Sequence, residues 1–126
     1  MTYTSALHLG NTHQEIVKLL DFYQKEIDFL EKMLAEVVNK NTAQEALAQA
    51  EHFQNQFLIQ KRNIDEYRNR IVHNAQLSSI DSQEHAGKVD ERLVLDAESM
   101  VKEVQTFEQI MNELRTEFKQ FLVKWM

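Results

Sequence analysis

Residues 93–125 read LVLDAESMVKEVQTFEQIMNELRTEFKQFLVKW, and this stretch decides the fold. Its apolar side chains follow one another at alternating steps of four and three residues, the spacing of helices that pack along a shared seam. The residues of this stripe are Leu93, Ala97, Met100, Val104, Phe107, Met111, Leu114, Phe118, Phe121 and Trp125. A helix with such a stripe is stable only when the rest of the chain, or another chain, covers the apolar face.

The composition of the whole chain also favours helices. Its 126 residues include two glycines and no proline, and tight turns between strands depend on these two residue types. Two earlier stretches repeat the apolar spacing of residues 93–125. We therefore predict a single all-α domain over residues 1–126. It would be an elongated antiparallel up-down-up three-helix bundle with coiled-coil-like heptad packing and a long third helix.

Helix boundaries follow from polar breaks and capping signals. Thr12 and Thr42 each begin a Thr-x-x-Glu capping box, in which the hydroxyl and the carboxylate satisfy free backbone N–H groups at a helix start. A second break is expected at residues 78–81, where serines and an aspartate offer caps for the next helix. The predicted helices span residues 12–38, 43–77 and 82–125.

Folding the chain at these breaks leaves the end of the third helix without a partner. Residue 116 would lie opposite Thr42, so that residues 117–126 project beyond the other helices. We predict that this tail makes a homo-oligomeric contact, as in a dimer, or binds another helical protein, because exposed aromatic residues are common interface anchors. The alternative is that the tail covers the end of its own bundle. The predicted interface residues are Phe118, Phe121, Leu122 and Trp125.

The histidines are the candidate metal ligands. In the expected register, His73, His85 and Asp81 gather at one end of the bundle, and His13 lies one turn deeper. These four residues form an alternative hypothesis, a small-ligand or metal-binding sensor bundle. The main prediction contains no metal and no cofactor, because the chain has no Glu-x-x-His motif of the kind found in di-iron bundles.

Polar residues interrupt the predicted seams at His13, Gln60 and Asn74. A buried amide that is hydrogen-bonded costs stability but selects the register of the helices. In the expected register Gln60 lies near Tyr23, and Lys61 lies opposite Asp21. We interpret these residues as structural, with a small polar ligand pocket as the alternative.

Composition and charge limit the function. The chain has no cysteine, which excludes thiol chemistry, and no glycine-rich loop for phosphate. Its net charge of −6 disfavours nucleic-acid and anionic membrane partners. No apolar run approaches the ~20 residues that span a bilayer. We expect a cytoplasmic protein that is not an enzyme and acts by protein–protein contact.

Overall fold

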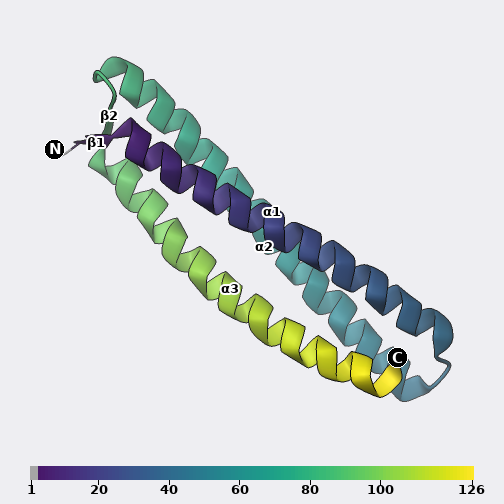
Figure 1. Ribbon diagram of the computed structural model, residues 1–126. Helices are drawn as coiled ribbons and strands as arrows, with labels where there is room; N and C mark the ends of the chain where they lie inside the picture. Colours follow the sequence, from purple (N-terminus) through teal and green to yellow (C-terminus); the bar gives the residue numbers. More distant parts are fainter. Residues whose placement is uncertain (1–2) are drawn as a thin grey trace.

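The computed structural model describes residues 3–126 and contains three helices. Strand β1 (Tyr3–Ser5) leads into helix α1 (Ala6–Lys40), a short link leads to α2 (Gln44–Glu84), and strand β2 (Lys88–Asp90) precedes α3 (Glu91–Trp125). Figure 1 shows the helices side by side along an elongated molecule, with β1 and the end of α3 at opposite ends. The predicted all-α, three-helix class is confirmed.

Each helix buries a continuous apolar stripe. In α3 the buried residues are Ala97, Met100, Val104, Phe107, Met111, Leu114, Phe118 and Phe121. The stripe of α1 includes Ile16, Leu20, Tyr23, Ile27, Leu30, Leu34 and Val37, and that of α2 includes Phe53, Phe57, Ile64 and Ile71. All but Ala97 of these form one core cluster. Burying a large apolar side chain contributes about 1.5–3 kcal/mol, so this cluster holds the three helices together.

A short two-stranded ladder lies at the end of the bundle where α2 turns into α3 (Figure 1). Strands β1 and β2 are antiparallel, and Val89 of β2 is buried with Leu9 and Ala97 in a second, smaller core. The N–H of Ala6 donates to the backbone O of Gly87 at 2.9 Å, so the ladder also positions the start of α1. Sequence reasoning did not predict these strands, because three residues are too few to show an alternating pattern.

The second chain reversal lies at residues 85–87, and the break expected at residues 78–81 is wrong. Helix α2 continues to Glu84. Ser78 is buried, and its hydroxyl donates to the backbone O of Asn74 at 2.7 Å. A serine whose hydroxyl donates to a carbonyl of its own helix does not interrupt that helix. The Ser78-Ser79 pair therefore does not end α2.

Two consecutive residues in the left-handed region make the turn after α2. Ala86 and Gly87 have φ angles of 53° and 86°. The chain then passes through β2, and the Asp90 carboxylate accepts the backbone N–H of Arg92 at 2.8 Å as the N-cap of α3. The third helix therefore begins at Glu91, later than predicted.

Neither predicted capping box forms. Helix α1 begins before Thr12, whose hydroxyl donates to the backbone O of His8 at 3.4 Å inside the helix. The N-cap residue of α2 is Ala43, and no side chain caps that end. Glu45, the acid of the second predicted box, instead pairs with Lys124 of α3 at 3.0 Å. The two Thr-x-x-Glu motifs therefore do not mark the helix starts.

Ion pairs between α1 and α2 define their register. Lys61 Nζ lies 2.8 Å from Glu31 Oε1, and Arg68 Nη2 lies 2.6 Å from Asp21 Oδ1. The predicted pair of Lys61 with Asp21 is therefore wrong, because Asp21 meets a base two turns further along α2. Hydrogen bonding to Glu31 raises the pKa of Lys61, so this ammonium stays charged at neutral pH.

Candidate functional site

The C-terminal end of α3 packs on its own chain, and the predicted overhang is wrong. Phe118 and Phe121 are 0% and 4% exposed. The Nε1–H of Trp125 donates to Oε1 of Gln49 at 3.1 Å, and the Trp125 backbone O accepts from Nδ2 of Asn41 at 3.0 Å. Because the second reversal comes later than predicted, the last turns of α3 lie beside the start of α2.

The two buried phenylalanines of α3 belong to an aromatic cluster with α2. The ring centroid of Phe53 lies 5.2 Å from that of Phe118 and 5.1 Å from that of Phe121, and Phe57 lies 5.2 Å from Phe118. The pairs of Phe118 with Phe53 and Phe57 are edge-to-face, a geometry that stabilises a core beyond its buried area. Of the predicted interface residues, Leu122 and Trp125 are half-buried at its margin.

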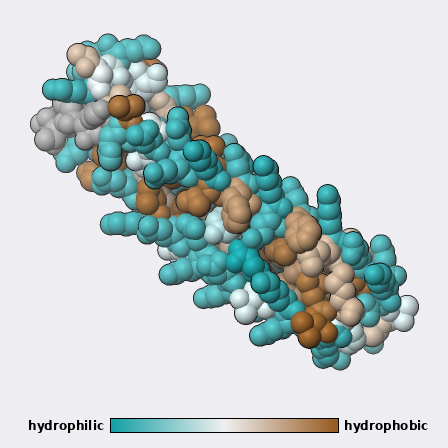
Figure 2. Space-filling view, viewed as in Figure 1, coloured by the Kyte–Doolittle hydropathy of each residue, from teal (hydrophilic) through white to brown (hydrophobic). Residues whose placement is uncertain are grey.

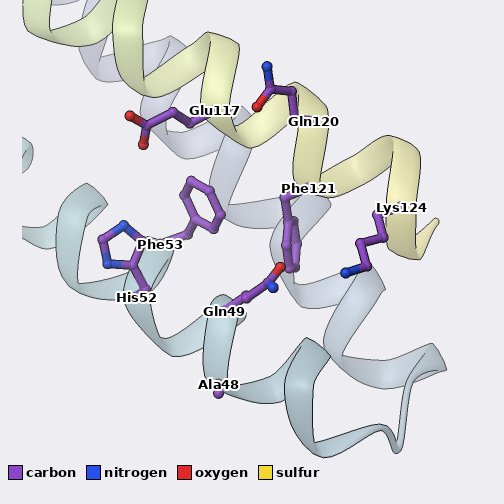
Figure 3. A pocket seen from close by; sticks show the side chains of 8 residues that line it. All are labelled: Ala48, Gln49, His52, Phe53, Glu117, Gln120, Phe121 and Lys124. Atoms are coloured by element: carbon purple, nitrogen blue, oxygen red, sulfur yellow. The ribbon is translucent and has the colours of Figure 1, made fainter.

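A hollow of about 490 Å³ lies over this cluster, between α2 and α3 (Figure 3). Phe53 and Phe121 form its apolar floor, and the remaining lining residues are Ala48, Gln49, His52, Glu117, Gln120 and Lys124. In Figure 3 both rings point into the space between the helices. The lining contains no serine, threonine or cysteine, so the hollow offers no nucleophilic hydroxyl or thiol. Its apolar floor and polar rim suit the reception of an apolar group.

Two phenylalanines of α1 are exposed, and sequence reasoning missed them. Phe22 and Phe29 are 56% and 60% exposed. Leu19 and Met33 continue the same side of the helix at steps of three and four residues and are partly buried. We call Leu19, Phe22, Phe29 and Met33 the α1 apolar face. The seven-residue spacing of the phenylalanines, outside the seam, was the signal in the sequence.

The α1 apolar face borders α3. Glu26 lies between its two phenylalanines on the same side of the helix, and Oε1 of Glu26 is 2.6 Å from Nη2 of Arg115 in α3. Leu122, half-buried, follows Arg115 by two turns on the same side of α3. Figure 2 shows hydrophobic side chains exposed over the second half of α1 and the end of α3. The apolar surface therefore extends across two helices.

Basic side chains flank this face. Lys18, Lys25 and Lys32 are exposed and lie three or four residues from a phenylalanine of the face, so they are its neighbours on the helix surface. In the part of the chain that the structure describes, none of the three forms an ion pair. Asp21 is engaged by Arg68, and Asp28 is exposed three residues after Lys25. The lysines therefore form a basic row next to the phenylalanines, and these two acids lie on the far side of that row.

A polar network joins all three helices near the ladder. Oδ1 of Asn74 lies 2.7 Å from Nε2 of His13, while Nδ2 of Asn74 donates to the backbone O of Leu93 at 3.0 Å and to Oδ2 of Asp96 at 3.1 Å. Because Nδ2 is the donor, Oδ1 accepts, and Nε2 of His13 carries a proton. His13 is therefore held by a structural amide.

Among the predicted metal ligands, the structure brings Asp81 and His85 together. Nδ1 of His85 lies 3.0 Å from Oδ1 of Asp81, and Glu84, which sequence reasoning missed, joins them. One ligand atom from each of the three lies within 4.8 Å of the others. His73 is exposed, and within residues 3–126 neither His73 nor His13 belongs to such a group.

The core tyrosines are not poised for acid–base chemistry. Burial raises the pKa of Tyr23, and the hydrogen bond that its hydroxyl donates to Glu108 at 3.0 Å raises it further. Burial also raises the pKa of Tyr67. These shifts lie away from neutrality, opposite to what a general base needs. Gln60, expected near Tyr23, instead accepts from Nδ2 of Asn63 at 3.1 Å.

Within residues 3–126, no helix has both the length and the apolar character needed to cross a membrane. Comparisons of the chain with protein-family models, with curated proteins and with solved structures found no match.

Proposed function

We propose that this chain is a non-enzymatic helical interaction module that binds an acidic amphipathic helix of another protein through the α1 apolar face. The exposure of Phe22 and Phe29, 56% and 60%, is the observation that carries the proposal. Aromatic side chains left in water forgo the free energy that their burial contributes, and clustered aromatics are frequent interface anchors. These two residues take the anchoring role that the sequence analysis gave to Phe118 and Phe121.

The dimensions of the face suit a single partner helix. From Leu19 to Met33 it extends about 21 Å at 1.5 Å per residue. Its members recur at the steps of three, four and seven residues with which one helix docks on another. Leu122 of α3 widens the surface on one side. A partner helix of about four turns would cover it.

The flanking charges select the chemistry of the partner. Lys18, Lys25 and Lys32 lie along one side of the face, and Lys119 of α3 is exposed one turn beyond Arg115 on the other side. Glu26, the acid within the face, is already neutralised by Arg115. A helix with glutamates or aspartates beside an apolar stripe would therefore be attracted and correctly oriented.

A second copy of this chain is the competing occupant. In an antiparallel pair of α1 helices with Phe22 opposite Phe29, Lys25 would meet Glu26 of the other copy, and Lys18 would meet Met33. Glu26 is already paired with Arg115 of its own chain, so it offers that lysine little. The net charge of −6 makes two copies repel each other. We therefore favour a different protein as the partner.

The bundle itself is part of the proposal. We propose an up-down-up arrangement with coiled-coil-like heptad packing, which gives the α1 apolar face a rigid support. The burial of residues at steps of three and four, and the cross-helix pairs of Lys61 with Glu31 and Arg68 with Asp21, support this packing.

The test uses a synthetic helical peptide of about 18 residues with leucines on one face and glutamates beside them. Its affinity is measured by calorimetry for the wild-type chain and for the double variant Phe22→Ser, Phe29→Ser. A matched control is Leu58→Ser, Ile59→Ser, two exposed apolar residues of α2. We expect the Phe22→Ser, Phe29→Ser variant to lose at least tenfold in peptide affinity and the control to keep the wild-type affinity. A peptide with lysines in place of glutamates should bind the wild type more weakly.

Two results would overturn the proposal. Equal peptide affinity of the wild type and the Phe22→Ser, Phe29→Ser variant would show that the α1 apolar face is not the binding surface. A wild-type dimer in light scattering that becomes a monomer in this variant would show that a second copy, and not an acidic helix, covers the face.

A further inference from the structure

We propose that Asp81, Glu84 and His85, at the C-terminal end of α2, bind a divalent transition-metal ion of the zinc class. One ligand atom from each residue lies within 4.8 Å of the other two. The distance from Nδ1 of His85 to Oδ1 of Asp81 is 3.0 Å. The site lies outside the α1 apolar face and adds a function independent of the proposed interaction.

The spacing and the donor atoms suit this class of ion. The three residues stand at positions i, i+3 and i+4 of one helix end, so their side chains leave the same side on consecutive turns. One imidazole nitrogen and two carboxylate oxygens form a set that zinc accepts. Three protein ligands leave a fourth position for water, as in open zinc sites.

The surroundings favour a cation. The last turn of α2 carries no basic residue, and the carbonyl groups at a helix C-terminus carry a partial negative charge. A hollow of about 420 Å³ beside the site is lined by two of the proposed ligands, Asp81 and Glu84, and by Asp90, which adds one further carboxylate. Arg92, also in the lining, pairs with Asp90 at 3.1 Å. The hollow gives an ion and its waters access from solvent.

The fold already holds two of the ligands in place. Oδ2 of Asp81 accepts the backbone N–H of Asp90 at 2.6 Å, and Nδ1 of His85 lies 2.9 Å from the backbone O of Asp81. Because a carbonyl oxygen only accepts, Nδ1 is the donor in this contact, and Nε2 is the nitrogen that would bind the ion. Partners that fix ligand orientation before the ion arrives reduce the cost of binding. Because Asp90 caps α3, an ion on Asp81 would also brace the corner between α2 and α3.

The test measures zinc binding to the full chain after removal of metal with EDTA. Zinc chloride is titrated, and bound metal is determined by equilibrium dialysis and elemental analysis. The variants are His85→Gln and Glu84→Gln, and the matched control is His73→Gln, an exposed histidine of the same helix outside the cluster. Circular dichroism in EDTA checks that each variant keeps its helical content.

We expect one zinc per wild-type chain, at least a tenfold loss of affinity in His85→Gln and in Glu84→Gln, and unchanged affinity in His73→Gln. Zinc should also raise the melting temperature of the wild type and of the control, but not of the two cluster variants. A wild type that binds no zinc would overturn the proposal. So would undiminished binding in either cluster variant.

Discussion

The indole Nε1–H of Trp125, in the last turn of α3, donates to Oε1 of Gln49 in α2 at 3.1 Å. The backbone O of the same residue accepts from Nδ2 of Asn41, in the link between α1 and α2, at 3.0 Å. The last turn of α3 thus contacts both α2 and the link that joins α2 to α1. The apolar tail of α3, which the sequence suggested as a free surface, closes the end of its own bundle.

Replacing this tryptophan should therefore destabilise the fold. We expect Trp125→Ala to lower the free energy of unfolding by about 2 kcal/mol, through the lost indole hydrogen bond and the apolar area exposed in the core. Urea denaturation followed by circular dichroism measures the change. The control is Val123→Ala, at a side chain that is 87% exposed, which should stay within about 0.5 kcal/mol of the wild type. Equal effects of the two substitutions would contradict the structural role of Trp125.

Features of this fold that depend on local interactions were predictable from the sequence, and features that depend on long-range contacts were not. The stripes were predictable because helical periodicity is local, and Phe107 or Met111 is buried for the same reason that it falls on the seam. The position of the second chain reversal was not predictable. Two adjacent serines usually indicate a helix end, but here the Ser78 hydroxyl donates to the backbone of its own helix. That one displacement changed the partner of every residue in α3.

The amide of Asn74 should be among the most sensitive polar groups in the protein. Asn74→Ala would leave His13, Asp96 and the carbonyl of Leu93 without their shared partner in a largely buried site. We expect a loss of about 3 kcal/mol in the free energy of unfolding, measured by urea denaturation, because unsatisfied buried polar groups cost about 1–3 kcal/mol each. Gln76→Ala, at an exposed position two residues along, should change it by less than about 0.5 kcal/mol. A small effect at Asn74 would mean that water replaces the amide without penalty.

The turn after α2 offers a substitution that should stabilise the protein. Ala86 has a φ of 53°, a conformation in which an L side chain is strained and glycine is not. We expect Ala86→Gly to raise the free energy of unfolding by about 0.5–1 kcal/mol, measured by the urea midpoint. The same change inside a helix, Ala48→Gly, should lower it by about 1 kcal/mol. A loss of stability in both variants would contradict the strain at Ala86.

The candidate sites were only partly accessible from the sequence. Asp81 and His85 share a helix side by simple spacing, and the structure places them 3.0 Å apart. The gathering of His13 and His73 depended on the wrong reversal, and it does not occur among the described residues. Phe22 and Phe29 lie outside the seam, where single apolar residues are common, so their exposure emerged only once α3 was placed beside α1.

The pH dependence of stability should report on the cap of α3. The hydrogen bond from the Arg92 side chain, followed by that from the Arg92 backbone N–H, lowers the pKa of Asp90 from its ordinary value of 3.8. In the unfolded chain this carboxylate binds a proton at higher pH than in the fold. Its contribution to stability is therefore fully present above the unfolded pKa and is lost as pH falls through the folded pKa.

Asp90→Asn keeps an oxygen that accepts the N–H of Arg92 but removes the titrating charge. We expect the wild type to be more stable than this variant at about pH 6, and the difference to narrow at about pH 3, as measured by urea denaturation at both values. Arg92→Gln removes the largest cause of the lowered pKa of Asp90. In a chain that carries Arg92→Gln, the stability difference that Asp90→Asn makes should therefore change less between the two pH values. A stability difference between the wild type and Asp90→Asn that stays constant with pH would contradict the lowered pKa. The carboxylate would then titrate in the fold as it does in the unfolded chain, and the cap would act through hydrogen-bond geometry alone.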